Sequence, residues 1–102
     1  MGIIGFVACK NGKEAEKIAI ALLKKRLVAC ANIVPKISSL YWWKGKIVQE
    51  EEALLLLKTL KKNQKKIIQE IKKIHSYSIP CIEFMGVKTN KECEKWLWRE
   101  IK

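Results

Sequence analysis

The sequence predicts an α+β domain in which two helices cover one face of a four-stranded antiparallel sheet. Two segments carry apolar residues at helical spacing, and four others are rich in residues typical of strands. The two kinds follow one another in the order strand, helix, strand, strand, helix, strand, with a short helix at the end. At 102 residues the chain is expected to form a single domain, 1–102, because no linker, repeat or low-complexity stretch divides it.

The first strand is expected at Ile3–Cys9. Asn11 then offers an N-cap, and Glu14 three residues later completes the pattern of a capping box. Apolar residues recur at helical spacing from there, which predicts a helix ending near Arg26. Its apolar stripe comprises Ala15, Ile18, Ala19, Leu22 and Leu23.

A long β-hairpin is expected next. Its first arm, Val28–Trp43, contains Pro35, which cannot donate a ladder hydrogen bond and therefore indicates a bulge or an edge. Residues 44–46 supply the turn, and Ile47–Leu60 forms the returning arm. Fourteen residues at ~3.3 Å each span about 46 Å, which exceeds the width of a small domain. The tip should therefore project or bend.

The second half of the chain repeats the alternation. Lys61–His75 is expected to form a helix, Ser76–Pro80 a loop, and Pro80–Val87 the last strand. Thr89 and Glu92 indicate a second capping box before a short terminal helix. The apolar stripe of that helix comprises Cys93, Trp96, Leu97 and Ile101. The complete order is that of a ferredoxin-like sandwich.

Both faces of the predicted sheet are apolar, although two helices can cover only one. Alternating residues of the strands place apolar side chains on each side: Ile3, Val7 and Cys9 against Ile4, Phe6 and Ala8; Leu54 and Leu56 against Leu55 and Leu57; Cys81, Met85 and Val87 against Ile82 and Phe84. A large exposed apolar surface is rare on a soluble monomer, so we expect self-association. The pattern does not choose between a dimer and a trimer.

Charge and composition narrow the function. The net charge of +11 meets the electrostatic requirement for a nucleic-acid binder. The aromatic signature of RNA-recognition motifs is missing from the first and third strands, so nucleic acid is not the expected partner. The chain has no Asp, which excludes a Ser-His-Asp triad, and no glycine-rich phosphate loop, so no enzymatic activity is expected.

The apolar segments and the cysteines bear on the cellular compartment of the protein. The longest apolar runs, such as Ala53–Leu57, fall far short of the ~20 residues that a membrane helix needs, so no membrane contact is expected. The first residues lack the basic region of a signal peptide, and none of the four cysteines forms a C-x-x-C motif. We therefore expect a cytoplasmic protein with free thiols.

Several segments, in order along the chain, resemble one family. They are the run Leu27–Ile33 (LVACANI), the hairpin Ser39–Gly45 (SLYWWKG), the strand Glu52–Thr59 (EALLLLKT), the loop His75–Pro80 (HSYSIP) and a C-terminal Trp96. Together they are similar to the divalent-cation tolerance proteins, CutA, over most of the chain.

The resemblance implies a ferredoxin-like subunit in a tight homotrimer, similar in architecture to the PII signalling proteins. It also implies a role in tolerance of copper and other divalent metals, with no required cofactor and no established enzymatic activity. Two other functions remain open. One is a basic nucleic-acid-binding module, and the other is a PII-like trimer that binds a small ligand in its subunit clefts.

His75, Cys81 and Cys9 are the candidate metal ligands. The family's loop proline is usually followed by an acidic residue where this chain has Cys81, and the loop His by Pro where it has Ser76. Cys9 stands where the family more often has Thr. A thiol in place of a carboxylate favours softer ions such as Cu(I) or Zn(II). The alternatives are a helix-capping role for His75 and core packing for the thiols.

Aromatic and basic residues near the hairpin and the loop are candidates for a cleft or subunit interface. Tyr41, Trp42 and Trp43 lie close to the predicted turn, where they could anchor a neighbouring subunit or stack on bases. Lys58 and Tyr77 join this group through the family pattern. For Lys58 the alternative is a strand-end lysine with its head in solvent.

Overall fold

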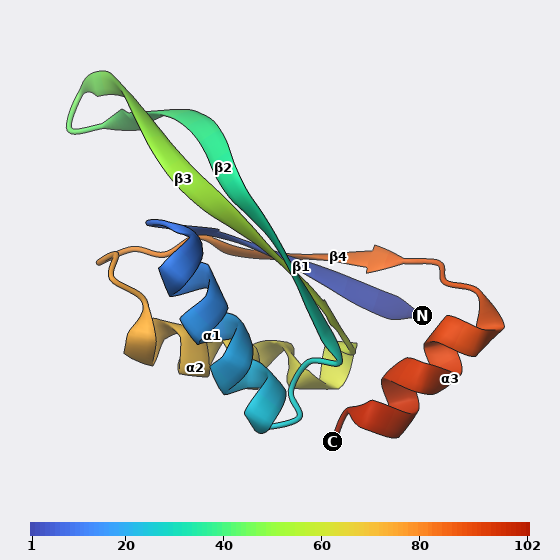
Figure 1. Ribbon diagram of the computed structural model, residues 1–102. Coiled ribbons are helices and arrows are strands. Elements are labelled where there is room, and N and C mark those ends of the chain that lie inside the picture. The colour runs from blue at the N-terminus through green and yellow to red at the C-terminus, as the bar shows by residue number, and fades with distance from the viewer.

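The computed structural model describes residues 1–102 and confirms the predicted order of elements. Four strands form one antiparallel sheet in the order β2-β3-β1-β4, and α1 and α2 lie along one face of it (Figure 1). This is the ferredoxin-like arrangement. The elements are β1 (Gly2–Cys9), α1 (Gly12–Lys24), β2 (Cys30–Trp43), β3 (Lys46–Thr59), the 3-10 turn η1 (Lys61–Asn63), α2 (Gln64–Ile74), β4 (Ile82–Val87) and α3 (Lys91–Glu100).

The central strand β1 sets the two faces of the sheet. It pairs with β3 on one side, where Val7 lies opposite Leu55, and with β4 on the other, where Val7 lies opposite Ile82. Because side chains alternate along a strand, the odd-numbered residues of β1 face the helices. Val7 and Cys9 are fully buried there. The core around them consists of Ala15, Ile18, Ala19, Leu22, Leu27, Val28, Ala53, Leu55, Leu57, Ile67 and Ile71.

Helix α1 begins as predicted, but it ends earlier. The Oδ1 atom of Asn11 accepts a hydrogen bond from the backbone N–H of Glu14 at 2.9 Å. The reciprocal half of the capping box is shifted by one residue, because the Glu14 carboxylate accepts from the N–H of Lys10. The helix ends at Lys24, and Arg26 has φ of 57°, a left-handed conformation that cannot continue it.

The long hairpin is confirmed. Its pairing register shifts between Val34 and Ile37, so Pro35 lies in a β-bulge. Lys44 and Gly45 both have positive φ in the two-residue turn, as a type I′ hairpin requires. The far end of the hairpin rises away from the helices and gives the molecule a long axis of 44 Å (Figure 1).

Other details in the second half of the chain also differ from the sequence prediction. The second helix starts with a 3-10 turn before α2, and the last strand begins only at Ile82, not at Pro80. The predicted second capping box is wrong. Asn90 is the N-cap of α3 and makes no capping bond, because its side chain donates to Glu92 at 3.2 Å. The hydroxyl of Thr89 is buried without a partner.

Helix α3 is held beside the start of α2 by a small apolar cluster of Leu60, Leu97 and Ile101. The Nδ2 atom of Asn63 donates to the carbonyl oxygens of Leu27, at 3.2 Å, and Lys102, at 3.1 Å. The end of the chain is thereby fastened to the base of the hairpin.

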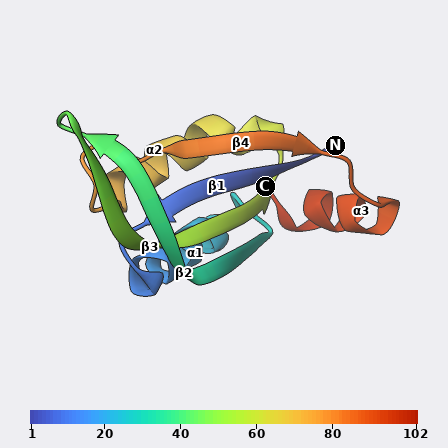
Figure 2. The ribbon, with the colours of Figure 1, turned by 90° about the horizontal axis from the view of Figure 1, so that it is seen from above.

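The second face of the sheet carries no helix (Figure 2). Ile4, Phe6 and Ala8 of β1 are half-buried on it, together with Leu54 and Leu56 of β3. Met85 of β4, opposite Ile4, is 51% exposed. We call this surface the bare face. None of the helices has the length and hydropathy needed to cross a membrane.

Two isoleucines of α1 provide a matched test of the core. Ile18 is fully buried, whereas Ile20 is 44% exposed. Ile18→Ala should lower the free energy of unfolding by about 2–5 kcal/mol, because it leaves a cavity between helix and sheet. Ile20→Ala should cost less than about 1.5 kcal/mol, since much of its side chain is already in water. Chemical denaturation of both variants measures the difference, and equal losses would contradict the assigned faces.

Candidate metal centre

Three potential ligands meet where β1, α1 and α2 come together. Cys9 is the last residue of β1, Glu14 lies in the first turn of α1, and His75 caps the end of α2. One ligand atom from each lies within 4.8 Å of the other two. The structure therefore brings together two of the residues that the sequence predicted and adds a carboxylate.

The imidazole of His75 is fixed by two backbone contacts. Its Nε2 lies 2.9 Å from the carbonyl oxygen of Ala8, and its Nδ1 accepts a hydrogen bond from the N–H of Tyr77 at 3.0 Å. This arrangement fits the neutral ring with its proton on Nε2. The side chain is fully buried. His75 is thus more than a helix cap, because it joins β1 to the loop that follows α2.

Glu14 connects the same elements. Its Oε1 accepts from the N–H of Lys10, and its Oε2 accepts from the N–H of Ser76, both at 2.9 Å. Oε1 also lies 3.8 Å from Nδ1 of His75. Burial acts to raise the pKa of Glu14, but the hydrogen bonds from Ser76 and Lys10 outweigh it and hold the pKa below its usual value. Glu14 is therefore ionised beside the buried ring.

Cys9 is the least available of the three ligands. Its thiol is fully buried and has only a weak contact, 3.7 Å, with the carbonyl oxygen of Val7. Burial, followed by the nearby carboxylates of Glu14 and Glu52, raises the pKa of Cys9 to about 12. The thiol is therefore protonated at neutral pH, and a metal would have to displace its proton.

A second carboxylate lies next to this cluster. Glu52 of β3 is only 7% exposed, and its Oε2 accepts a hydrogen bond from the hydroxyl of Tyr77 at 2.5 Å. Burial and this bond raise the pKa of Tyr77. The rings of Tyr77 and His75 lie 4.7 Å apart. Tyr77 thereby links the cluster to the middle of β3.

The other candidate residues lie elsewhere. Cys81 is exposed and does not belong to the three-residue group. Lys58 is half-buried on β3, opposite Cys30 and Ile4, on the bare face. Near the hairpin turn, Trp42 is 73% exposed. Trp43 and Tyr41 lie beside it, and the Tyr41 hydroxyl donates to Glu50.

Sequence reasoning missed Glu14 and Glu52 as parts of the site. The capping box gave Glu14 a complete local role, so nothing pointed to a further one. Only the approach of α2 to the start of α1 shows that its carboxylate also meets His75 and Ser76. Glu52 appeared in the sequence simply as the first residue of a family-like strand.

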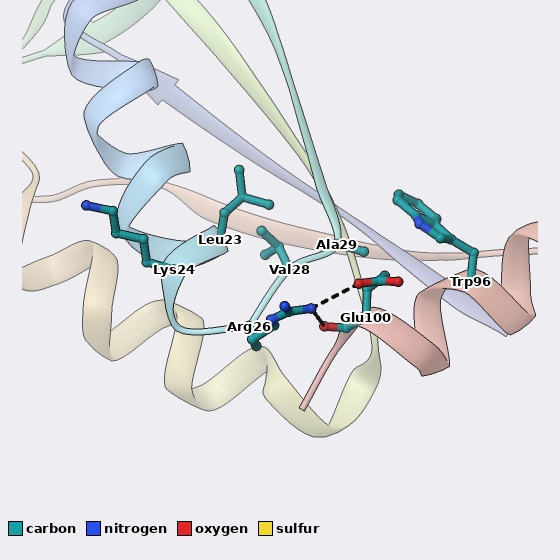
Figure 3. Close-up of a pocket in the computed structure, with 7 residues that line it drawn as sticks. All are labelled: Leu23, Lys24, Arg26, Val28, Ala29, Trp96 and Glu100. Carbon is teal, nitrogen blue, oxygen red and sulfur yellow. Dashed lines mark hydrogen bonds and ion pairs between the residues drawn. The ribbon is translucent and has the colours of Figure 1, made fainter.

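A separate hollow of about 400 Å³ lies between the end of α1, the start of β2 and α3 (Figure 3). Trp96 and Val28 form part of its apolar lining. Nη1 of Arg26 donates to Oε1 of Glu100 at 2.9 Å at its edge. None of the predicted metal ligands or cleft residues lines this hollow.

The residues of the cluster fit a metal ion chemically. Thiolate, imidazole and carboxylate are the ligands that zinc and copper accept in proteins, and together they supply the sulfur and nitrogen donors that these ions prefer. Each donor is engaged in the structure by a proton or a hydrogen bond. An ion would therefore take the place of the thiol proton and of the bond between Tyr77 and His75.

Comparison with known proteins identifies the family. The sequence model of the CutA1 divalent ion tolerance protein matches residues 3–100. The chain belongs to this family. It is 38% identical over 93 residues to the divalent-cation tolerance protein CutA of Archaeoglobus fulgidus, covering 90% of each chain. It is 37% identical over 101 residues to CutA of Pyrococcus horikoshii, covering 98% of each.

Solved CutA structures share its fold. The structure of the periplasmic divalent cation tolerance protein CutA from Archaeoglobus fulgidus superposes with a TM-score of 0.96, 34% identity and complete coverage of both chains. The protein from Thermus thermophilus gives the same values. Mouse and human Protein CutA are longer. They are 40% identical to this chain over 74 residues, and the aligned part spans 42% and 41% of their lengths.

The thiols should differ sharply in reactivity. Iodoacetamide at about pH 8 should modify the exposed Cys81 first, because the thiolate is the nucleophile and access is open. Cys9 should react only after unfolding, since it is buried and its pKa is raised to about 12. Mass spectrometry of peptides against time of labelling measures both rates. Labelling of Cys9 at the rate of Cys81 would contradict the buried placement.

Proposed function

We propose that this chain is a homotrimeric, non-enzymatic metal-binding protein of divalent-cation tolerance, and that it holds copper or zinc at Cys9, Glu14 and His75. The observation that carries the proposal is the convergence of three ligand atoms within 4.8 Å from three separate elements. Cys81 is the third ligand that the sequence predicted. It is exposed on the loop before β4, outside the cluster, and its substitution serves as the control for that of Cys9.

The electrostatics of the cluster favour a cation. Burial is the main cause of the raised pKa of Cys9, and the carboxylates of Glu14 and Glu52 add to it through the negative potential that they create at the sulfur atom. The same potential stabilises a positive ion at that place. This negative potential is confined to the cluster, whereas the chain as a whole has a net charge of +11. A divalent ion would balance the charge of the Glu14 carboxylate and of the Cys9 thiolate that forms on binding.

The same geometry supports a role without catalysis. A nucleophilic cysteine needs a lowered pKa or a base beside it, whereas Cys9 is buried with a raised pKa. Nδ1 of His75 would have to lose its hydrogen bond from the N–H of Tyr77 before it could act as a general base, just as it would before binding an ion. For location we propose the cytoplasm, where the four unpaired cysteines would stay reduced.

The bare face supports assembly into an oligomer. It presents Ile4, Phe6, Leu54 and Leu56 with no helix above them, and Met85 is half-exposed beside them. The hairpin adds the exposed Leu40, Trp42 and Ile47 near its far end. A second copy of the chain is the simplest cover for these surfaces. The resemblance to CutA proteins favours three copies.

Metal titration tests the proposed centre. Wild-type protein should bind Zn(II), or Cu(I) under reducing conditions, with one high-affinity ion per chain. Cys9→Ser and His75→Gln should each lower this affinity at least ten-fold, because each removes one of the three donors. Competition against a chromophoric chelator measures the affinities, and circular dichroism confirms that each variant is folded.

Cys81→Ser is the matched control, because it also removes one thiol, and it should bind metal like the wild type. If Cys81→Ser lost the ion while Cys9→Ser kept it, the centre would lie at the loop and not at the cluster. If wild type and all variants failed to bind, the proposed metal site would be wrong.

Sedimentation tests the oligomer. Wild-type protein at micromolar concentration should sediment with three times the mass of the 11.8 kDa chain. Phe6→Glu should shift it toward the monomer, because a carboxylate would be placed at the centre of the bare face. Ile20→Glu on the outer side of α1 should leave the mass unchanged. A stable wild-type monomer would rule out the assembly.

A further inference from the structure

The outer surface of α2 carries a stripe of lysines that is interrupted by one glutamine. Ile67 and Ile71 anchor the helix to the core on its inner side. On the exposed side, from η1 to the end of α2, lysines recur at helical spacing, and the one acidic residue of this segment, the partly buried Glu70, lies at the edge of the row. Its members, which we call the lysine stripe, are Lys61, Lys62, Lys65, Lys66, Lys72 and Lys73, with Gln69 between them.

Most of these charges have no partner in the chain. Lys73 lies 3.2 Å from Glu70, which also pairs with Lys25 at 2.7 Å. The other five lysines have no carboxylate within 4.0 Å. Like charges three or four residues apart destabilise a helix by a few tenths of a kcal/mol for each pair. The buried isoleucines hold the helix in place, so the fold itself does not need the lysines.

An exposed aromatic ring adjoins one end of the stripe. Trp98 of α3 is 56% exposed, although its neighbour Leu97 is buried. The Nζ atom of Lys62 lies 5.2 Å from the centre of the Trp98 ring, so the indole is continuous with the stripe. An indole that is partly open to water beside a row of ammonium groups offers a flat apolar surface next to positive charge.

We propose that the lysine stripe and Trp98 bind single-stranded nucleic acid. Lysines neutralise phosphates, and an exposed ring stacks on an unpaired base without regard to sequence. Residues 61–73 rise about 18 Å along the helix axis, which provides room for a few consecutive nucleotides. The proposal does not depend on the metal centre, which lies at the far end of α2.

The expectation that nucleic acid is not a partner rested on the strands, where the aromatic signature is missing. The stripe lies on the opposite layer of the molecule, so that absence does not bear on it (Figures 1 and 2). An assembly that closes over the bare face would leave all its stripes open. A membrane is a poorer fit, because the apolar side of α2 is buried and cannot insert into lipid.

Binding of a fluorescein-labelled 12-nucleotide oligouridylate to the full chain tests the proposal, with anisotropy measured between about 50 and 200 mM salt. The triple variant Lys62→Gln, Lys65→Gln, Lys72→Gln should weaken binding at least ten-fold at about 50 mM salt. It should also reduce the slope of log K against log salt by about 2, the value for three phosphate contacts on a single strand.

A second triple variant, Lys13→Gln, Lys44→Gln, Lys46→Gln, is the matched control. It removes the same three charges from exposed positions on α1 and around the hairpin turn. Its affinity should stay within about two-fold of the wild type. Trp98→Leu should weaken binding about five- to ten-fold without changing the salt slope, because a stacking contact carries no charge. Trp42→Leu, at the exposed hairpin end, should have no effect.

Three outcomes would overturn the proposal. The first is equal weakening by the two triple variants, which would mean that net charge alone attracts the RNA. The second is no binding by the wild type at about 50 mM salt. The third is binding to phosphatidylserine vesicles without binding to the oligonucleotide, which would make the stripe a membrane contact. Thermal melts of each variant confirm that the chain remains folded.

Discussion

The register of β1 is the constraint on which the rest of the structure depends. Its odd-numbered residues are directed under the helices and its even-numbered residues onto the bare face. A slip of one residue would exchange the two sets and move Cys9 out of the core. Such a slip would break the hydrogen bonds of β1 to both β3 and β4. It would also remove Val7 and Cys9 from the core that α1 and α2 cover.

The same register creates the candidate metal centre. Cys9 ends the strand at the point where α1 begins and α2 ends, so a thiol, a carboxylate and an imidazole meet in a small buried volume. Their hydrogen bonds to the backbone of Lys10, Ser76 and Tyr77 tie these elements together. A buried polar cluster is stable only when its donors and acceptors are satisfied, and here each partner is supplied by a neighbouring element. An ion bound to His75 would replace a hydrogen bond that also holds the loop after α2 in place.

The two layers of the molecule have different surface chemistry. The sheet layer presents apolar side chains such as Phe6 and Met85, which favour contact with another copy of the chain. The helix layer presents lysines, which repel a second positive surface and favour anionic partners. Assembly through the first surface leaves the second one in solvent. The proposed oligomerisation, metal binding and nucleic-acid binding would thus use separate parts of the fold.

The sequence by itself determined the order of the elements, the long hairpin with its bulge at Pro35, and the presence of two apolar sheet faces. These follow from local chemistry and periodicity, since proline cannot donate to a ladder and side chains alternate along a strand. Element ends were less predictable. Thr89 is a residue type that is favoured at helix N-caps, but Asn90 occupies the N-cap position of α3. Only the tertiary structure decided which thiol meets His75, because packing of the end of α2 against the connection between β1 and α1 selected Cys9 with Glu14 and left Cys81 exposed.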